Sequence, residues 1–241
     1  MSYLNMLVQP IIKNVSPDDS RKVCSFKLPH PELGNVELCV KPRLTSTDRF
    51  ISEVRNSEQE VLGSDIFDLF SEKKQMFEYD ISVKPVHRGK SLGELLRLAS
   101  IIEMIENKVQ ELNNYSKNTA VYFHSKYKFI PDSNSFSHRN ETIRNISNNK
   151  TPEFSEFSEA ALEISNKIEE TPIQNYPEQQ SLFKLSNQFI NEYIQKVMSL
   201  GKQSESKFDI GFNMKLTREN VLKNADFFNE LFAKHGIDYT I

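Results

Sequence analysis

The apolar residues of this chain follow two different periods, and the change between them near residue 90 constrains the fold more than any other feature. Before Val83, several segments alternate apolar and polar residues, as strands with one buried face do. From Ser91 the apolar residues recur about every 3.6 positions, and this stripe continues to about Asn107. The sequence therefore predicts strands that lead directly into a long helix.

The alternating segments indicate where the strands lie. Residues 21–42 predict a hairpin that turns at His30–Asn35, where Pro, Gly and Asn gather. Two further strands are predicted at Glu60–Phe70 and Met76–Val83. Pro85 ends the second of them, because proline has no backbone N–H to donate within a sheet.

The second half of the chain is less regular. A short strand is predicted at Val109–Leu112, and a helix begins near Asn118, a residue type that favours helix N-termini. Residues 131–150 are rich in Asn and Ser and predict a linker or mobile loop. The remaining expected elements are helices at Phe157–Glu169 and Leu182–Leu200, a strand at Phe208–Leu216, and a last helix from Thr217 to Gly236.

The charge balance argues against several classes of protein. The chain has 30 Lys and Arg against 33 Asp and Glu, a net charge of −3, so we expect no nucleic-acid partner. No apolar run approaches the ~18 residues of a membrane span, and the N-terminus lacks the features of a signal peptide. We therefore expect a soluble, cytoplasmic protein. Cys24 and Cys39 predict neither a disulfide framework nor a zinc site, and the histidine and acidic spacings predict no metal.

Glycine is scarce, with seven in 241 residues, so its positions are informative. Gly89 and Gly93 both lie in Arg88–Gly93, between a predicted strand and the long helix. A helix N-terminus carries unpaired N–H groups and a partial positive charge, and glycine lets an anion approach the backbone. The segment predicts a phosphate-binding loop to which Arg88 and Lys90 add charge, although a basic helix cap with a packing glycine has the same residues. Neither GxxxxGK[ST] nor GxGxxG is present.

Four segments, in order, resemble the GNAT N-acetyltransferase superfamily. The strand end and loop are similar to the family's motif A, and residues 118–129 are similar to its motif B. Two other segments are similar to the strand before motif A and to the closing strand. The resemblance covers about residues 20–130 and 207–217, and its segments are Val83-x-Pro85-x-x-Arg88-Gly89-Lys90-x-Leu92-Gly93, Asn118-Thr119-Ala120-x-x-Phe123-x-x-x-x-x-Phe129, Glu60-Val61-Leu62-Gly63 and Phe212-Asn213-Met214-Lys215-Leu216.

The resemblance implies a three-layer α/β fold, in which a twisted, mixed and mostly antiparallel sheet is flanked by helices. Residues 1–130 would form the acetyl-CoA-binding core, residues 131–206 a linker with a helical insertion, and residues 207–241 the closing strand and a C-terminal helix. The apolar stripe of Leu182–Leu200 favours packing within the fold, and an acceptor groove or a homodimer face are its alternatives.

The resemblance also implies acetyl-CoA as the cofactor, held between the predicted strands Met76–Val83 and Val109–Leu112. The pyrophosphate would lie on the backbone amides of the loop, and the pantetheine would pair with the strand edge before it. The residues implied to bind acetyl-CoA are Ile81, Val83, Arg88, Gly89, Lys90, Ser91, Leu92, Gly93 and Asn118.

The catalytic residues follow from the same resemblance. His124 stands where many members have a tyrosine that protonates the departing thiolate, and Tyr122 and Tyr127 are nearby substitutes; a surface histidine is the alternative. Glu78 is a candidate base, because period two places it on one strand face with Asp80 and Ser82, which is equally a solvated face. At two positions where the family usually has glycine, this chain has Ser91 and Lys128.

The leading hypothesis is an N-acyltransferase that transfers an acetyl group to a primary amine by direct attack on the thioester. The acceptor is expected to be a small-molecule or peptide amine. The alternative is a catalytically degenerate GNAT-like module that binds CoA or a protein partner, a reading that Ser91 and Lys128 support. A third reading is an interaction protein whose helical region binds another chain.

Overall fold

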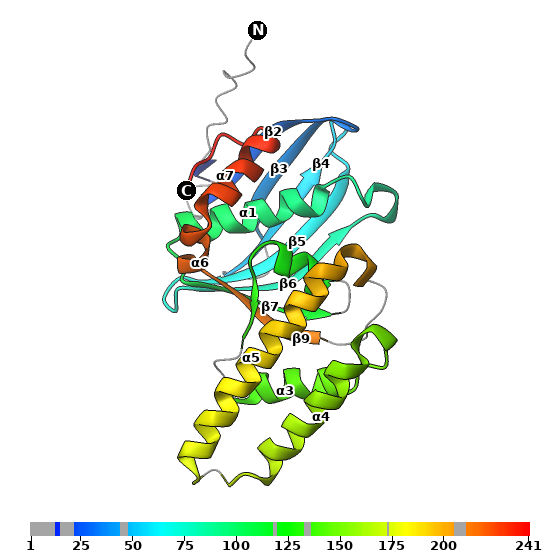
Figure 1. Cartoon of the computed structure of the whole chain (residues 1–241). Helices are drawn as coiled ribbons and strands as arrows, with labels where there is room; N and C mark the ends of the chain where they lie inside the picture. The colour runs from blue at the N-terminus through cyan, green and yellow to red at the C-terminus, as the bar shows by residue number, and fades with distance from the viewer. Residues whose placement is uncertain are drawn as a thin grey trace. The chain divides into compact units, whose positions relative to one another are not determined.

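The computed structural model describes residues 13–14, 22–43, 48–117, 120–132, 136–172, 174–204 and 211–241. They form two compact units, each described by itself below, and Figure 1 shows their elements. The first unit contains the described residues up to Leu112 together with Thr217–Ile241, and the second contains those from Asn113 to Leu216. These divisions fall inside two strands, and the domain boundaries expected after residues 130 and 206 stay a prediction.

The strands of the first unit pair in sequence order, each antiparallel to the next. The predicted hairpin is confirmed, and His30 lies opposite Gly34 at its turn. The strands predicted at Glu60–Phe70 and Met76–Val83 are confirmed as β5 and β6, whereas the sequence did not predict β4. The strands are β1 (Lys13–Asn14), β2 (Lys22–His30), β3 (Gly34–Pro42), β4 (Arg49–Arg55), β5 (Val61–Phe70) and β6 (Gln75–Val83).

The helix α1 (Leu92–Glu106) packs on β3, β4, β5 and β6 and covers one face of these strands (Figure 1). Leu95, Leu96 and Leu98 of its apolar stripe are almost completely buried. The predicted helix from Ser91 to Asn107 is therefore confirmed.

The chain leaves α1 through a Schellman motif. Lys108 has a left-handed φ of 55°, its N–H donates to Ile105 O at 3.2 Å, and the N–H of Val109 donates to Met104 O at 2.9 Å. Because Val109 belongs to this helix cap, the strand predicted at Val109–Leu112 is wrong in its bounds. The observed strand is β7 (Glu111–Lys117).

The C-terminal residues of the first unit form α6 (Arg218–Lys223) and α7 (Ala225–Lys234). In Figure 1, α7 lies over the same face of the strands as α1. The two are joined because Glu94 of α1 accepts hydrogen bonds from Lys234 Nζ at 2.5 Å and His235 Nε2 at 2.6 Å. The single helix that was expected here is broken at Asn224, whose side-chain amide donates to Asn220 O at 2.7 Å.

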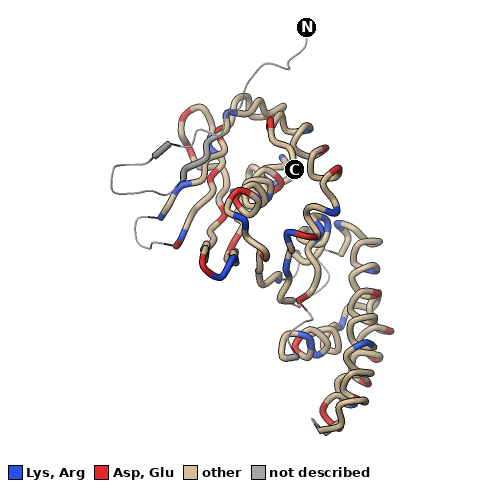
Figure 2. The backbone as a smooth tube through the Cα atoms, turned by 90° about the vertical axis from the view of Figure 1, so that its left-hand side faces the viewer, with Lys and Arg blue, Asp and Glu red and all other residues tan. Residues whose placement is uncertain are grey.

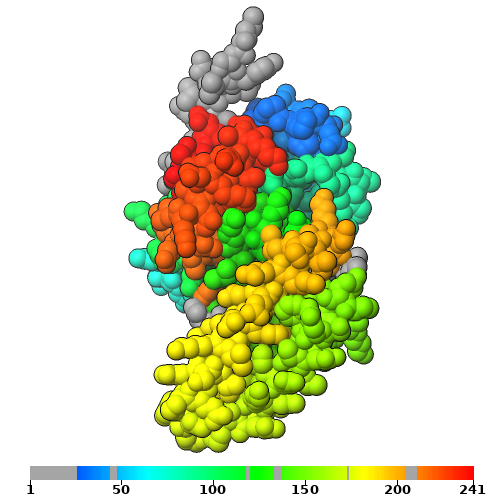
Figure 3. Space-filling model, in the orientation of Figure 1, coloured from blue at the N-terminus to red at the C-terminus, as the bar shows by residue number. Residues whose placement is uncertain are grey.

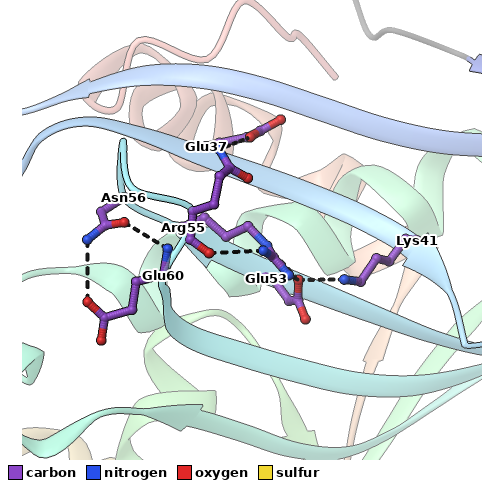
Figure 4. A network of polar contacts seen from close by, with 7 residues as sticks. Glu37, Lys41, Glu53, Arg55, Asn56 and Glu60 are labelled. Atoms are coloured by element: carbon purple, nitrogen blue, oxygen red, sulfur yellow. Dashed lines mark hydrogen bonds and ion pairs between the residues drawn. The ribbon is translucent and has the colours of Figure 1, made fainter.

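Charged residues of β3 and β4 make a polar network on the sheet, shown in Figure 4. Glu53 Oε2 lies 2.8 Å from Lys41 Nζ and 2.6 Å from Arg55 Nη2. Burial opposes ionisation of Glu53, but the hydrogen bonds from Lys41 and Arg55 outweigh it and lower the pKa of this carboxyl group. The network thus pairs the charged side chains that β3 and β4 carry among their apolar residues.

The second unit combines three strands with most of the helices. β9 lies between β7 and β8, and β8 pairs antiparallel with β9. The side chains of α4 and α5 lie against each other (Figure 3). Besides β7, the elements are α2 (Ala120–Lys126), β8 (Ile130–Pro131), α3 (Phe136–Ser147), η2 (Pro152–Phe154), α4 (Ser155–Glu170), α5 (Tyr176–Leu200), η3 (Gly201–Ser204) and β9 (Gly211–Thr217).

The linker expected at 131–150 is instead largely the helix α3, so that prediction is wrong. Ile143 and Ile146 are completely buried, and α3 packs on α4 and α5. Two asparagines form tertiary hydrogen bonds, from Asn145 Nδ2 to Gly211 O at 2.6 Å and from Asn149 Nδ2 to Tyr193 Oη at 3.0 Å. Packing and these bonds override the weak helix propensity of the segment.

The expected α/β class, a mostly antiparallel sheet flanked by helices, is confirmed by these elements.

Lys, Arg, Asp and Glu are spread over both units instead of gathering in one segment (Figure 2). Among the helices of the described residues, none combines the length and the apolar character needed to cross a membrane.

Candidate active site

The candidate cofactor loop connects β6 to α1. β6 ends at Val83, and Pro85 begins a single 3-10 turn, η1 (Pro85–His87), because its fixed φ suits the first position of a turn. The chain then extends at Arg88 and enters α1 at Ser91, which precedes the first helical residue, Leu92. The loop predicted from the sequence is therefore a strand–loop–helix connection.

Two residues of this loop have left-handed backbone conformations. Gly89 has a φ of 81° and Ser91 a φ of 59°, and Lys90 lies between them. Left-handed residues in a tight loop turn neighbouring N–H groups toward one side, which forms a concave anion site. Within the described part of the chain, no acceptor lies in hydrogen-bond range of the N–H groups of Ser91, Leu92 and Gly93. These donors fit a diphosphate at the positive end of α1.

The two cations of the loop have local partners. Arg88 Nε donates to Val83 O at 3.3 Å, and Lys90 Nζ lies 3.9 Å from Glu32 Oε2. Arg88 is exposed and the Lys90 side chain is 29% exposed, so both charges remain in contact with solvent. They add positive charge around the free N–H groups.

The last residues of β6 present their backbone groups alternately to its two edges. Ser82 pairs with Ser64, and the N–H of Lys84 donates to Leu62 O at 3.0 Å. By alternation, Ile81 and Val83 direct their N–H and C=O groups away from β5. The resemblance implies pantetheine along this edge of β6, which stays a prediction.

Gly63 allows β5 and β6 to approach closely beside the loop. A Cβ atom at this position would lie 2.9 Å from Ser82 O and 3.2 Å from a methyl of Val83. A side chain would therefore push the end of β6 out of place. The glycine that resembles the family's strand before motif A has a local steric reason here.

Glu78, the predicted base, does not share a face with Asp80 and Ser82. The pairing of β5 with β6 shifts register between Ile66 and Phe67, so a β-bulge breaks the alternation. Glu78 is 2% exposed, whereas Asp80 and Ser82 are exposed. The shared face that period two predicted is therefore wrong.

Glu78 belongs instead to a buried polar cluster that joins β5, β6 and α1. Its Oε2 accepts from Arg97 Nη2 at 2.6 Å, and Asp65 of β5 accepts from Ser100 Oγ at 2.6 Å. Burial raises the pKa of Asp65 well above its usual range, the Glu78 carboxylate raises it further, and Arg97 opposes both. These effects favour the neutral form of Asp65, and the cluster joins α1 to the strand that leads into the loop.

The predicted acid His124 lies on α2 in the second unit and is buried. Asn114 Nδ2 lies 3.1 Å from His124 Nδ1, and Asn114 Oδ1 accepts from Ser116 Oγ at 2.9 Å. With an amide N–H facing Nδ1, the imidazole carries its proton on Nε2. The ring also contacts Phe123 and Phe129, so His124 is not a surface histidine.

Tyr122 lies on another side of α2. Its hydroxyl oxygen is 3.8 Å from the position of a Cβ at Gly201, which places it at η3, whereas His124 contacts β7. The structure therefore does not bring Tyr122 and His124 together. Asn118, the remaining predicted cofactor residue, lies outside the described residues.

The structure groups the predicted residues by unit. Ile81, Val83 and all six loop residues form one continuous segment of the first unit, together with Glu78, whereas Tyr122 and His124 belong to the second. The sequence did not predict Asp65, Arg97 or His30 as part of this region. The sequence contains a sign of Asp65 and Arg97, because each is a charged residue within an otherwise apolar pattern, which often marks a buried polar cluster.

Comparisons with known proteins find similarity at the level of structure. No protein-family model and no curated protein matches the sequence. The solved structures that the chain resembles include nourseothricin acetyltransferase (17% identity, TM-score 0.33, 45% of this chain and 73% of that chain). Others are a GNAT-family acetyltransferase of Staphylococcus aureus Mu50 (17%, 0.32, 37% and 59%) and the PaiA N-acetyltransferase of Thermoplasma acidophilum in complex with coenzyme A (18%, 0.31, 37% and 57%).

These solved structures are described as acetyltransferases, and the Staphylococcus protein is described as a member of the GNAT family. The matched part spans less than two thirds of the Staphylococcus and Thermoplasma proteins. TM-scores this low do not establish the fold, so the fold is described from the observed helices and strands. Those elements, antiparallel strands followed by a glycine-containing loop and a long helix, agree with the α/β arrangement that the motifs imply.

Proposed function

We propose that this chain is an acetyl-CoA-dependent N-acyltransferase that acetylates a primary amine. The observation that carries the proposal is the row of N–H groups at Ser91, Leu92 and Gly93, which has no acceptor in the described residues and opens α1 after two left-handed residues. A diphosphate supplies the acceptors that these donors need.

Bound acetyl-CoA would supply an acetyl thioester, whose carbonyl carbon a neutral amine attacks as the carbon–sulfur bond breaks. The loop amides hold the diphosphate, and Arg88 and Lys90 screen its charge. The backbone groups of Ile81 and the N–H of Val83 hold the extended pantetheine in register with β6, because Val83 O already accepts from Arg88 Nε. These contacts hold the thioester in a fixed position. Such positioning supplies a large part of the rate acceleration when an amine attacks the thioester directly.

The proton balance is simple, because the amine nitrogen loses one proton and the thiolate sulfur gains one. His124 is the candidate donor to sulfur. For it to carry a proton on both nitrogens, the Asn114 amide must turn by about 180°, so that Oδ1 faces Nδ1 and Ser116 accepts from Nδ2. Tyr122 is the substitute donor. Glu78 is buried and held by Arg97, so in this proposal it positions the strand and the amine loses its proton to water.

The first test is a binding measurement on the wild-type chain. Acetyl-CoA should raise the melting temperature, because a ligand that binds only the folded state stabilises it. Gly93→Glu should abolish this shift by placing a carboxylate against the diphosphate, and Ser71→Glu, in the exposed turn after β5, should leave it unchanged.

Catalysis is measured separately as thiol release from acetyl-CoA with a panel of primary amines. No thermal shift at millimolar acetyl-CoA would refute the proposal. A shift without thiol release for any amine would support the degenerate CoA-binding module instead.

A further inference from the structure

His30 connects the β2–β3 hairpin to the candidate cofactor loop. It is the last residue of β2 and only 8% exposed. Its Nδ1 lies 3.2 Å from the backbone nitrogens of both Glu32 and Leu33, and its Nε2 lies 2.8 Å from Lys90 O. The contact with Lys90 spans 60 residues of sequence.

These contacts define the protonation of the ring. Glu32 and Leu33 each present an N–H to Nδ1, so Nδ1 accepts in this arrangement. The proton of the neutral imidazole is therefore on Nε2, and the ring donates to the Lys90 carbonyl. Both nitrogens have defined partners, one within the hairpin and one in the loop.

The Lys90 carbonyl is the group that most affects an anion in this loop. The peptide bond between Lys90 and Ser91 is trans, so its C=O and N–H point in opposite directions. When Lys90 O is held toward His30, the N–H of Ser91 is turned to the opposite side. Rotation of this peptide would bring a carbonyl oxygen toward the diphosphate and remove a donor from it.

The residue after this peptide bond, Ser91, has an unfavourable backbone conformation. Ser91 has a φ of 59°, in the left-handed region that is unfavourable for a non-glycine residue because its Cβ atom crowds the backbone. A hydrogen bond to the preceding carbonyl helps to offset this cost. The chain therefore keeps the loop geometry without a glycine at this position by means of a contact from a distant hairpin.

We propose that His30 is a positioning residue for the cofactor loop: its Nε2–H holds the Lys90 carbonyl away from the ligand and directs the Ser91 N–H toward the diphosphate of CoA. This inference rests on the proposed function, because it assumes that the loop binds a diphosphate. It adds a residue outside the four segments that resemble the GNAT motifs.

Two conservative variants of His30 test the roles of its two ring nitrogens separately. The amide of asparagine reaches about as far as Nδ1, so His30→Asn keeps an acceptor for the hairpin N–H groups but loses the donor to Lys90. The amide of glutamine reaches about as far as Nε2, so His30→Gln keeps that donor. If His30 served only the hairpin, His30→Asn would keep more of the wild-type behaviour than His30→Gln. If His30 positions the loop, His30→Gln should keep more of the CoA binding than His30→Asn.

The experiment measures Kd for CoA and for inorganic pyrophosphate by calorimetry, together with the melting temperature. We expect His30→Asn to weaken both ligands about tenfold, equivalent to about 1.4 kcal/mol, and His30→Gln to stay within about threefold of the wild type. In turnover assays, His30→Asn should raise KM for acetyl-CoA and leave kcat unchanged. Val36→Ala, a buried substitution in the same hairpin, should lower the melting temperature without changing Kd.

The possible failures are distinguishable. Wild-type chain that binds neither CoA nor pyrophosphate would overturn the proposed function and this inference with it. Wild-type binding with an unchanged Kd in His30→Asn would overturn only the role of His30. Weaker binding in both variants, in proportion to their loss of stability, would also overturn it and leave His30 as a hairpin residue.

Discussion

At the scale of single residues, Ser91 and Lys128 stand where the motifs that this sequence resembles usually have glycine, and both have a backbone conformation that glycine favours. Ser91 and Lys128 have left-handed φ values of 59° and 67°. Lys128 follows α2, and the N–H of Phe129 after it donates to His124 O at 3.1 Å, as in a glycine-type helix cap. The backbone at both positions therefore has the conformation that glycine favours, although neither residue is glycine.

Ser91→Gly should stabilise the fold by about 1 kcal/mol, because glycine adopts φ > 0 without the steric cost of a Cβ atom. The measurement is the free energy of unfolding in urea. The matched control is Ser71→Gly in an exposed turn where φ is not positive, and it should destabilise by up to about 1 kcal/mol through the entropy of the unfolded chain. A lower free energy of unfolding in Ser91→Gly would contradict this account.

At the scale of elements, α1 is joined to the sheet by charge as well as by apolar packing. The buried cluster of Asp65, Glu78, Arg97 and Ser100 crosses from β5 and β6 to the helix. Removing one partner of a buried ion pair usually costs more than the pair contributes, because the remaining charge stays desolvated. The cluster therefore sets the register of α1 over β6, and with it the shape of the loop between them.

The raised pKa of Asp65 predicts how stability depends on pH. A carboxyl group whose pKa is higher in the folded than in the unfolded state loses stability as the pH rises from its ordinary value of 3.8 toward the folded value. Asp65→Asn cannot ionise, so its free energy of unfolding relative to the wild type should increase over that range. The measurement is urea unfolding at several pH values from about 4 to 9.

Asp80→Asn is the control for this pH series, because Asp80 lies on β6 but is exposed. Its difference from the wild type should change less with pH than that of Asp65→Asn. A constant difference between Asp65→Asn and the wild type at all pH values would show that folding does not raise the pKa of Asp65.

At the scale of the whole molecule, the first unit is built from two separate stretches of chain. Its C-terminal helices follow the last strand and return to α1, where Lys234 and His235 reach Glu94 and where Tyr239 Oη donates to Glu106 Oε1 at 2.8 Å. The helix that begins at the candidate loop thus depends on residues about 140 positions later in the sequence.

Phe232→Ala should therefore destabilise α1 as well as α7. Phe232 is completely buried, and loss of a buried phenylalanine side chain costs about 3–5 kcal/mol. Amide hydrogen exchange should be faster in both helices. Leu222→Ala, which truncates an exposed side chain of α6, is the control and should change exchange little. Faster exchange confined to α7 would show that α1 is stable without it.

The sequence by itself determined the helices α1 and α5, the strands β5 and β6 except for the bulge in their pairing, and the loop that contains Gly89 and Gly93. These features are local, since period, proline and glycine act over a few residues. The tertiary structure alone decided that Asn-rich residues form α3, that a bulge buries Glu78 against Arg97, and that His30 holds Lys90. Each of these depends on contacts between residues distant in sequence, where packing and buried hydrogen bonds outweigh local preference.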